Sequence, residues 1–189
     1  SVDYGDAWDR VVLSSSLDGA RSAEFADLDG DGDRDVVAAA QFSNTVTWFE
    51  YDAGVWTEHH LAAVDGAHQA VPYDIDRDGD VDLALAAATE DTVAWIENLG
   101  EAASWSVHEL SEAADGVRTV VVGDVNGDGS PDLVTGEELA SSVTRFSNLT
   151  PDRDPLFCAG ATIPLADPVE LVPVDAENDG DIDIVTASG

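Results

Sequence analysis

The sequence has no lysine, no methionine and only one cysteine among its 189 residues. Its seven basic residues are all arginine and stand against 40 acidic residues, which gives a formal net charge of −33 at pH 7. Such a surface repels nucleic acid and anionic lipid, so we expect neither as a partner. Cys158 has no second cysteine to pair with, and we expect it to be a small core residue.

The sequence also lacks the motifs of membrane insertion and of catalysis. No apolar run reaches the length that a membrane-spanning helix needs, so we expect no insertion into a membrane. No GxSxG, HExxH, P-loop or dinucleotide fingerprint occurs, and we therefore predict that the protein is not an enzyme. Hydrophobic residues make up 44% of the chain, which is enough for a sizeable core.

What the sequence has is a repeat, because its acidic residues concentrate in four nine-residue loops that align without gaps. The loops start at Asp27, Asp74, Asp124 and Asp175 and read DLDGDGDRD, DIDRDGDVD, DVNGDGSPD and DAENDGDID. Their starts are 47, 50 and 51 residues apart, a spacing that indicates one structural unit per copy. Much acidity remains outside these loops, and a high-salt environment that screens self-repulsion would account for it.

Each loop lies among segments with the pattern of short β-strands. The apolar runs VVAAA, LALAAA, LVTG and IVTAS follow the four loops and predict buried strands. TVTWFE from Thr45, TVAWIE from Thr92 and SVTRFS from Ser142 alternate like half-exposed strands. WTEHHL from Trp56 and WSVHEL from Trp105 predict a fourth strand, and WDRVVL from Trp8 matches their pattern. In the third unit the pattern of this strand is degenerate, near LFCAGATI. Four strands in each repeat predict an all-β fold of β-propeller blades, each of four antiparallel strands.

The order of these segments predicts three complete blades and partial ones in a single β-propeller region, residues 1–189. The predicted repeats are approximately 1–16 (the last strand of a preceding blade), 17–64, 65–114, 115–166 and 167–189 (a partial blade). A propeller removes open edges by pairing its first and last strands in one blade, and here that blade would lack its third strand. Three outcomes stay open: a gapped four-bladed ring, self-association through the incomplete blades, or a segment of a longer chain.

The loops have the ligand pattern of a calcium site. Oxygen-bearing side chains occupy loop positions 1, 3, 5 and 9, and glycine at position 6 permits the turn that points the position-7 carbonyl inward. Calcium takes six to eight oxygen ligands, whereas zinc and copper favour the Cys and His that the loops lack. We therefore predict four Ca²⁺ ions, held by Asp27, Asp29, Asp31, Asp33, Asp35; Asp74, Asp76, Asp78, Asp80, Asp82; Asp124, Asn126, Asp128, Ser130, Asp132; and Asp175, Glu177, Asp179, Asp181, Asp183.

Three alternatives fit the loops less well. An EF-hand shares the first nine positions but needs a glutamate at position 12 and helices on both sides. Position 12 is instead Ala38, Leu85, Thr135 or Thr186, and the flanks have strand patterns. Acidic turns without a metal would leave packed carboxylates repelling one another, and magnesium suits a flexible all-protein cage less well than calcium.

The DxDxDGxxD loop between two strands, with the trailing TVxWxEN and WxxHxL segments, resembles the FG-GAP/VCBS repeats of integrin-alpha-type propellers. The resemblance covers almost the whole chain. It implies calcium between the first two strands of each blade, a ring of about seven blades, and roles in adhesion, in glycan or protein binding, or in secreted enzymes as an accessory domain. Glu177 departs from the Asp or Asn that is usual in the family, which sets the fourth site apart.

A second candidate site is cationic. Arg21, His68 and Arg118 are equivalent residues just before the first strand of three successive blades, and equivalent positions in a propeller form a ring around its axis. The ring would suit an anionic group, such as a glycan carboxylate or an acidic side chain. The alternative is that these residues pair with carboxylates of nearby loops.

Together these patterns predict an extracellular calcium-binding module for adhesion, structural assembly, or protein or glycan binding, with calcium as a structural ion. Calcium sites of modest affinity fill where calcium is millimolar, which favours a location outside the cell or on its surface. The alternative is a non-catalytic propeller domain of a secreted polysaccharide-degrading enzyme. An intracellular calcium sensor is disfavoured, because stacked blades do not open an apolar groove.

Overall fold

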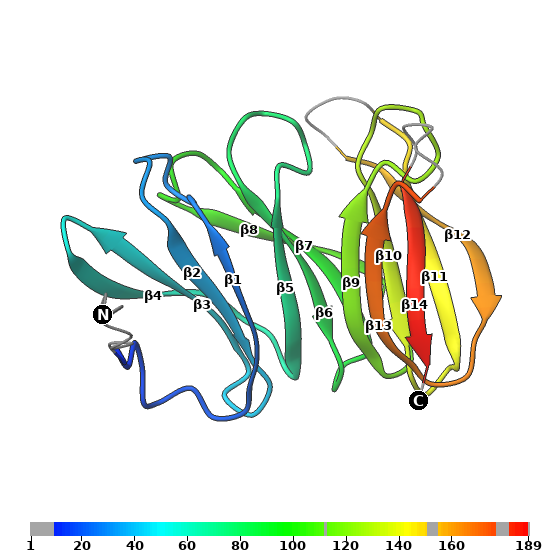
Figure 1. Ribbon diagram of the computed structural model, residues 1–189, viewed down its shortest axis with the longest axis horizontal. Helices are drawn as coiled ribbons and strands as arrows, with labels where there is room; N and C mark the ends of the chain where they lie inside the picture. The colour runs from blue at the N-terminus through cyan, green and yellow to red at the C-terminus, as the bar shows by residue number, and fades with distance from the viewer. Residues whose placement is uncertain (1–9, 112, 151–154, 177–181, 189) are drawn as a thin grey trace, which may run out of the picture.

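The computed structural model describes residues 10–111, 113–150, 155–176 and 182–188. These residues form fourteen β-strands and no helix, in four antiparallel sheets that follow one another along the chain (Figure 1). The first sheet contains β1 (Ala20–Ala26), β2 (Asp35–Ala40), β3 (Thr45–Asp52) and β4 (Val55–Ala63). The second contains β5 (Ala67–Tyr73), β6 (Asp82–Ala87), β7 (Thr92–Asn98) and β8 (Trp105–Ser111). The third contains β9 (Val117–Gly123), β10 (Asp132–Glu137), β11 (Ser142–Asn148) and β12 (Phe157–Pro164), and the fourth contains β13 (Pro168–Val174) and β14 (Asp183–Ser188).

Within each four-stranded sheet the strand order follows the chain, so every connection joins antiparallel neighbours. The first strands of successive sheets lie next to one another, β1 beside β5, β5 beside β9 and β9 beside β13. Figure 1 shows the sheets stacked side by side in this order. The predicted all-β fold with four-stranded antiparallel blades is confirmed; within the described residues the sheets do not close into a ring.

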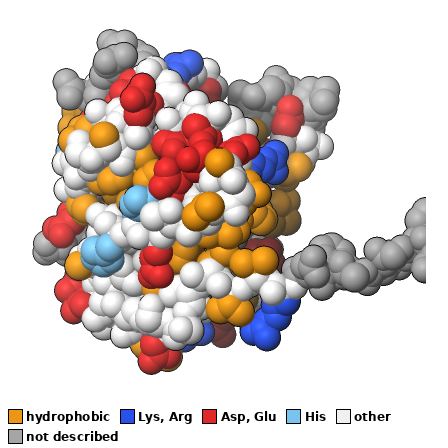
Figure 2. Space-filling view, turned by 90° about the vertical axis from the view of Figure 1, so that its left-hand side faces the viewer, with side chains coloured by type: hydrophobic (Ala, Val, Ile, Leu, Met, Phe, Trp, Pro, Cys, Tyr) orange, Lys and Arg blue, Asp and Glu red, His pale blue; other side chains and the backbone are white. Residues whose placement is uncertain are grey.

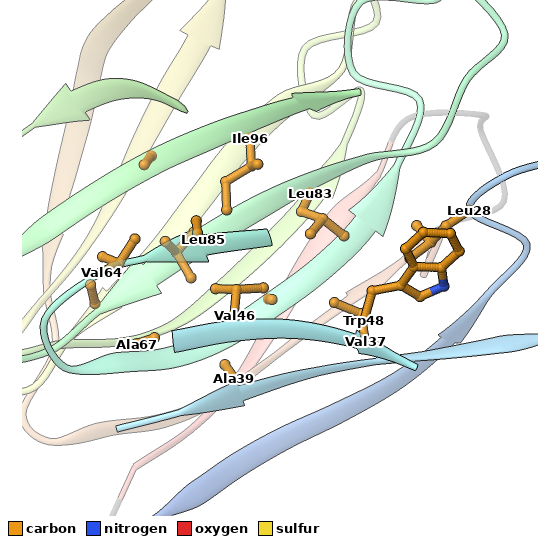
Figure 3. Packing of buried hydrophobic residues seen from close by; sticks show 14 residues of the cluster. Leu28, Val37, Ala39, Val46, Trp48, Val64, Ala67, Leu83, Leu85 and Ile96 are labelled. Carbon is orange, nitrogen blue, oxygen red and sulfur yellow. The ribbon is translucent and has the colours of Figure 1, made fainter. Parts of the chain in front are cut away.

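The core lies between the sheets. Trp48 projects from β3 toward the second sheet, where Leu83, Leu85 and Ile96 pack against it and its neighbours (Figure 3). Trp95 does the same between the second and third sheets. Each fully buried aliphatic side chain contributes about 1.5–3 kcal/mol, so these contacts hold neighbouring repeats together.

The second strands of the second and third sheets are the most buried, because these sheets lie between two neighbouring sheets (Figure 1). Every residue of β6 and β10 is buried, which explains their uniformly apolar or small side chains. Gly66 lies in the turn before β5 and has a φ of 75°. A Cβ added at this position would lie 2.2 Å from Oγ1 of Thr89. Only glycine fits that turn.

Two expectations about single segments are wrong. The predicted strand at Trp8–Leu13 is absent over Arg10–Leu13, while Trp8 and Asp9 lie outside the described residues. A strand of this type pairs with a third strand, and the fourth sheet offers none among the described residues. Cys158 is exposed rather than in the core, because β12 is the outermost strand of the third sheet and none of the described residues forms a fourth strand of the next sheet to cover it.

The described residues include no helix that is long and apolar enough to cross a membrane.

Candidate metal-binding loops

The first three loops connect the first and second strands of their sheets, β1 to β2, β5 to β6 and β9 to β10. The fourth runs from β13 to β14; its predicted ligands Glu177, Asp179 and Asp181 lie outside the described residues. Every position-6 glycine in the three described loops has a positive φ, 96° at Gly32 and 101° at Gly79. The sharp turn that a calcium loop needs at this position is therefore present.

The side chains at positions 1, 3 and 5 fold inward onto the loop backbone. In the first loop, Asp27 accepts the N–H groups of Gly30 (2.8 Å) and Gly32 (3.0 Å), and Asp31 accepts the N–H of Asp33 (2.8 Å). The third loop repeats these bonds through Asp124 and Asp128. Bonds of this kind hold the carboxylates in place and leave further lone pairs free for a cation.

Position 9 has a role that the sequence analysis missed. Asp82 accepts the N–H of Ile75 within the loop (3.0 Å) and the N–H of Asn98 at the end of β7 (2.8 Å), so that one buried carboxylate joins the loop to the third strand. Equivalent bonds run from Leu28 and Tyr51 to Asp35, from Asn148 to Asp132, and from Ala176 to Asp183. The donors are backbone N–H groups, which every residue type except proline has. The sequence at the donor positions therefore gives no signal of these bonds.

The loops bring carboxylates close enough together to share a cation. Ligand atoms of Asp27, Asp29 and Asp35 lie within 4.8 Å of one another in the first loop. Those of Asp74, Asp76 and Asp78 do so in the second loop, and both groups can hold a metal ion. Figure 2 shows acidic side chains gathered in a dense patch on one side of the molecule.

Two of the loops contain a buried carboxylate oxygen that no hydrogen-bond donor contacts in the described structure, Oδ1 of Asp74 and Oδ2 of Asp132. An anionic oxygen that has lost water and gained no partner is strongly unfavourable. One divalent cation in each of these two loops would supply the missing partner of its carboxylate oxygen. The oxygen-only ligands of both loops therefore fit calcium.

The protonation of these carboxylates reflects the same crowding. Burial raises the pKa of Asp29, and the charges of Asp31 and Asp35 raise it further. Burial and the neighbouring Asp78 and Asp74 act in the same way on the pKa of Asp76. Burial raises the pKa of Asp82 to about 6. The loops therefore favour the arrival of positive charge, whether from protons or from a metal ion.

The third loop is the least negative of the three described. It has Asn126 and Ser130 where the second loop has aspartates. The Ser130 N–H lowers the pKa of Asp128, and Arg145 adds to this effect. Arg145 stands on β11 where β3 and β7 have tryptophan. Burial raises the pKa of Asp132, and the charge of Arg145 partly opposes this rise.

Neighbouring loops are in contact. Arg77 occupies position 4 of the second loop with φ of 63°, where the first and third loops have glycine. Its Nη1 donates to the carbonyl oxygen of Gly129 in the third loop (2.6 Å). This bond connects the acidic loops of two adjacent repeats.

The three residues of the predicted cationic site lie near one another, although they stand in β1, β5 and β9 and not before these strands. Arg21, His68 and Arg118 line one cavity of about 390 Å³, which Glu24 and Glu170 also reach. The His68 ring donates from Nδ1 to the Arg118 carbonyl oxygen (2.7 Å). Burial lowers the pKa of His68, and the two nearby arginines lower it further, so its ring is neutral at pH 7.

The arginines of this cavity have partners outside the acidic loops. Arg21 donates from Nε and Nη2 to Oε1 of Gln41 (2.8 and 2.6 Å), and Arg118 forms an ion pair with Glu138 (2.5 Å). Within the described part of the chain, neither arginine therefore pairs with a carboxylate of the Asp-rich loops, and Glu138 belongs to the turn between β10 and β11.

His59 and His108 follow the repeat. His59 stacks on Trp48 with ring centroids 4.5 Å apart and contacts Glu50 (2.7 Å). His108 forms the same arrangement with Trp95 and Glu97. Both histidines thus have a structural role on the outer strands and are not metal ligands of the loops.

Comparison with known proteins agrees with this architecture. A model of the FG-GAP-like repeat matches residues 27–85 and 74–135, which together span more than half of the chain. A search of curated proteins gave no match. Both matched segments run from one acidic loop through the strands to the next, so they contain the repeating unit described above. On this evidence of repeat, loop and sheet, the chain belongs to the FG-GAP-like repeat family.

Proposed function

We propose that this chain is an extracellular calcium-binding β-propeller repeat module in which calcium is a structural ion. The observation that carries the proposal is the pair of buried, unpartnered carboxylate oxygens, on Asp74 and Asp132, inside loops whose ligands are all oxygen. The bound ion would neutralise carboxylates that otherwise repel one another and would fix the connection between the first two strands of each sheet.

The module would serve adhesion, structural assembly, or protein or glycan binding. FG-GAP-like repeats are generally non-catalytic and typically occur in extracellular proteins, which supports both this role and a location outside the cell. Millimolar calcium there would keep sites of modest affinity filled. Four sites are proposed, one for each loop, with the fourth including Asp175 and Asp183.

The cavity lined by Arg21, His68 and Arg118 is proposed as the contact for an anionic group of the partner. Two arginine side chains and a neutral imidazole converge there on a molecule with a net charge of −33. A carboxylate of a glycan or of an acidic side chain could replace Gln41 and Glu138 as an acceptor for the arginines. Arg21→Gln together with Arg118→Gln should weaken binding to an acidic-glycan array, whereas binding unchanged by both substitutions would exclude the cavity.

Calcium stoichiometry tests the central proposal. Protein freed of metal with a chelator should bind four calcium ions in isothermal titration calorimetry, and excess magnesium should compete poorly. Asp74→Asn should remove or greatly weaken one site, while Asp52→Asn, which changes an exposed acid outside the loops, should leave all four. Absence of calcium uptake at millimolar concentrations, or equal loss of sites in both variants, would contradict the proposal.

A further inference from the structure

The cavity between Arg21, His68 and Arg118 has a polar lining that is held in place across neighbouring sheets. Oγ of Ser22 on β1 accepts the N–H of Ala70 on β5 (3.2 Å). Oε1 of Gln69 on β5 accepts the N–H of Val120 on β9 (2.9 Å). Ser22 and Gln69 both line the cavity, so part of its polar surface is positioned before any ligand arrives.

We propose that this cavity binds one acidic sugar residue of a glycan, with the sugar carboxylate at Arg21 and the sugar hydroxyls at His68, Glu24 and Glu170. The inference rests on the anionic contact put forward under the proposed function and names the ligand class of that contact. Three features of the cavity argue for a sugar acid over an acidic side chain of a protein.

The first feature is an arginine that neutral groups hold in place. Nε and Nη2 of Arg21 both donate to Oε1 of Gln41, and the guanidinium lies over the Phe42 ring, 5.5 Å from the ring centroid. Among the described residues no carboxylate forms an ion pair with Arg21, and no acceptor contacts its Nη1. A ligand carboxylate would gain a charge-assisted hydrogen bond there, at a charge that no ion pair balances.

The second feature is an acceptor for a hydroxyl group. Nδ1 of His68 lies 2.7 Å from the Arg118 carbonyl oxygen, which can only accept, so Nδ1 carries the hydrogen. Because the ring is neutral, its Nε2 is a hydrogen-bond acceptor. An aspartate or glutamate side chain has no hydroxyl to donate to this atom, whereas a sugar acid carries hydroxyls on the same ring as its carboxylate.

The third feature is a pair of acids in the same cavity. Glu24 and Glu170 both line it, and both side chains are exposed. Their charges oppose a ligand that carries several negative groups, such as a run of acidic side chains or a sulfated chain. Each carboxylate accepts hydrogen bonds from hydroxyls, however. The cavity therefore selects a ligand with one carboxylate and several hydroxyls, which is the chemistry of a single uronic acid residue.

Three small ligands separate these contributions. The methyl glycoside of glucuronic acid should bind isotope-labelled, calcium-loaded protein saturably in NMR titrations, with shifts concentrated at the starts of β1, β5 and β9. Methyl glucoside has a CH₂OH group in place of the carboxylate and should bind at least about tenfold more weakly, because it loses the charge-assisted bond. Acetylated glutamic acid α-amide keeps a carboxylate without ring hydroxyls, and it should also bind at least about tenfold more weakly.

Protein variants assign each contact to a residue. Arg21→Gln should reduce the binding of the glucuronide to that of the glucoside and leave the glucoside unchanged. His68→Phe should weaken both sugars several-fold and spare the glutamate analogue, whereas His68→Gln, which keeps an acceptor, should retain most of the sugar binding. Arg10→Gln removes an exposed arginine outside the cavity and should change nothing. The urea midpoint of each variant shows that it is folded.

Two results would overturn the sugar acid and leave the anionic contact in place. They are a glutamate analogue that binds as tightly as the glucuronide, and equal effects of Arg21→Gln on both sugars. Shifts at the acidic loops that Arg21→Gln does not change would assign the carboxylate to bound calcium and overturn the proposal. If neither acid binds the folded protein, the anionic contact fails with it, whereas calcium uptake is measured separately by the calorimetry.

Discussion

Replacing Asp82 by alanine tests whether its carboxylate stabilises the fold apart from any bound metal. Asp82 is fully buried and accepts two backbone N–H groups, from Ile75 and Asn98, which are themselves 0% and 1% exposed. In Asp82→Ala both donors lose their acceptor in a site that water does not reach. Because an unsatisfied buried donor costs about 1–3 kcal/mol, we expect a loss of about 2–6 kcal/mol in the free energy of unfolding, with or without calcium.

Asp78 in the same loop is the matched control. It accepts the N–H of Asp80 (2.9 Å) in a half-buried turn, where water can take over the bond. Asp78→Ala should therefore cost no more than about 1 kcal/mol in chelator. In saturating calcium its cost should grow, because a site filled to a hundredfold excess over its Kd contributes about 2.7 kcal/mol that the variant loses.

Urea unfolding of the three proteins, in chelator and in millimolar calcium, measures these differences from the transition midpoints. The expected pattern is a large loss for Asp82→Ala in both buffers and a calcium-dependent loss for Asp78→Ala. If Asp82→Ala were no less stable than Asp78→Ala in chelator, the inferred connection between loop and third strand would contribute nothing to stability, and the reasoning would be refuted.

Three further predictions follow from the loops and outer strands. Folding raises the pKa of Asp82 from 3.8 to about 6, so the folded state binds the extra proton; in chelator the melting temperature should fall as pH rises through this interval, and a rise would contradict it. Arg145→Gln should strengthen calcium binding by the third loop several-fold, read from loop resonances in an NMR titration; unchanged affinity would show that its charge is screened. His108→Ala removes the stack on Trp95 and the contact with Glu97, and should lower the free energy of unfolding by about 1 kcal/mol in urea, whereas a loss of several kcal/mol would indicate a larger role.

The strands and the loop positions could be predicted from the sequence because each depends on local chemistry. Alternating β-branched and aromatic residues predicted β3, β7 and β11, and glycine at position 6 predicted the turns that Gly32 and Gly79 make. The second role of Asp35 and Asp82 could not be predicted, because a carboxylate suits a metal ion and a backbone N–H equally well. Only the fold shows that β3 and β7 end beside these side chains.

Burial was harder to predict than strand formation, because it depends on a neighbour that the local pattern does not specify. Cys158 and Ile163 stand in a strand with an apolar pattern like that of buried residues elsewhere in the repeat. Both are exposed, because no third or fourth strand of the next sheet covers β12 within the described residues. A repeat sequence therefore predicts which strand faces are apolar, and the structure shows which of these faces a neighbouring sheet buries.

The acidic loops also form part of the interfaces between repeats, because residues of adjacent repeats bond to them. Asn98, at the end of β7, donates from Nδ2 to the carbonyl oxygen of Leu28 in the first loop (3.0 Å), while its own N–H reaches Asp82 in the second. The Arg77–Gly129 bond joins the second loop to the third in the same direction along the chain. An ion that orders one loop therefore orders an anchor of the next sheet, so filling one site should favour the next. Asn98→Ala should consequently reduce the cooperativity of calcium binding in calorimetry more than it reduces the number of sites, and a loss of sites with unchanged cooperativity would contradict this coupling.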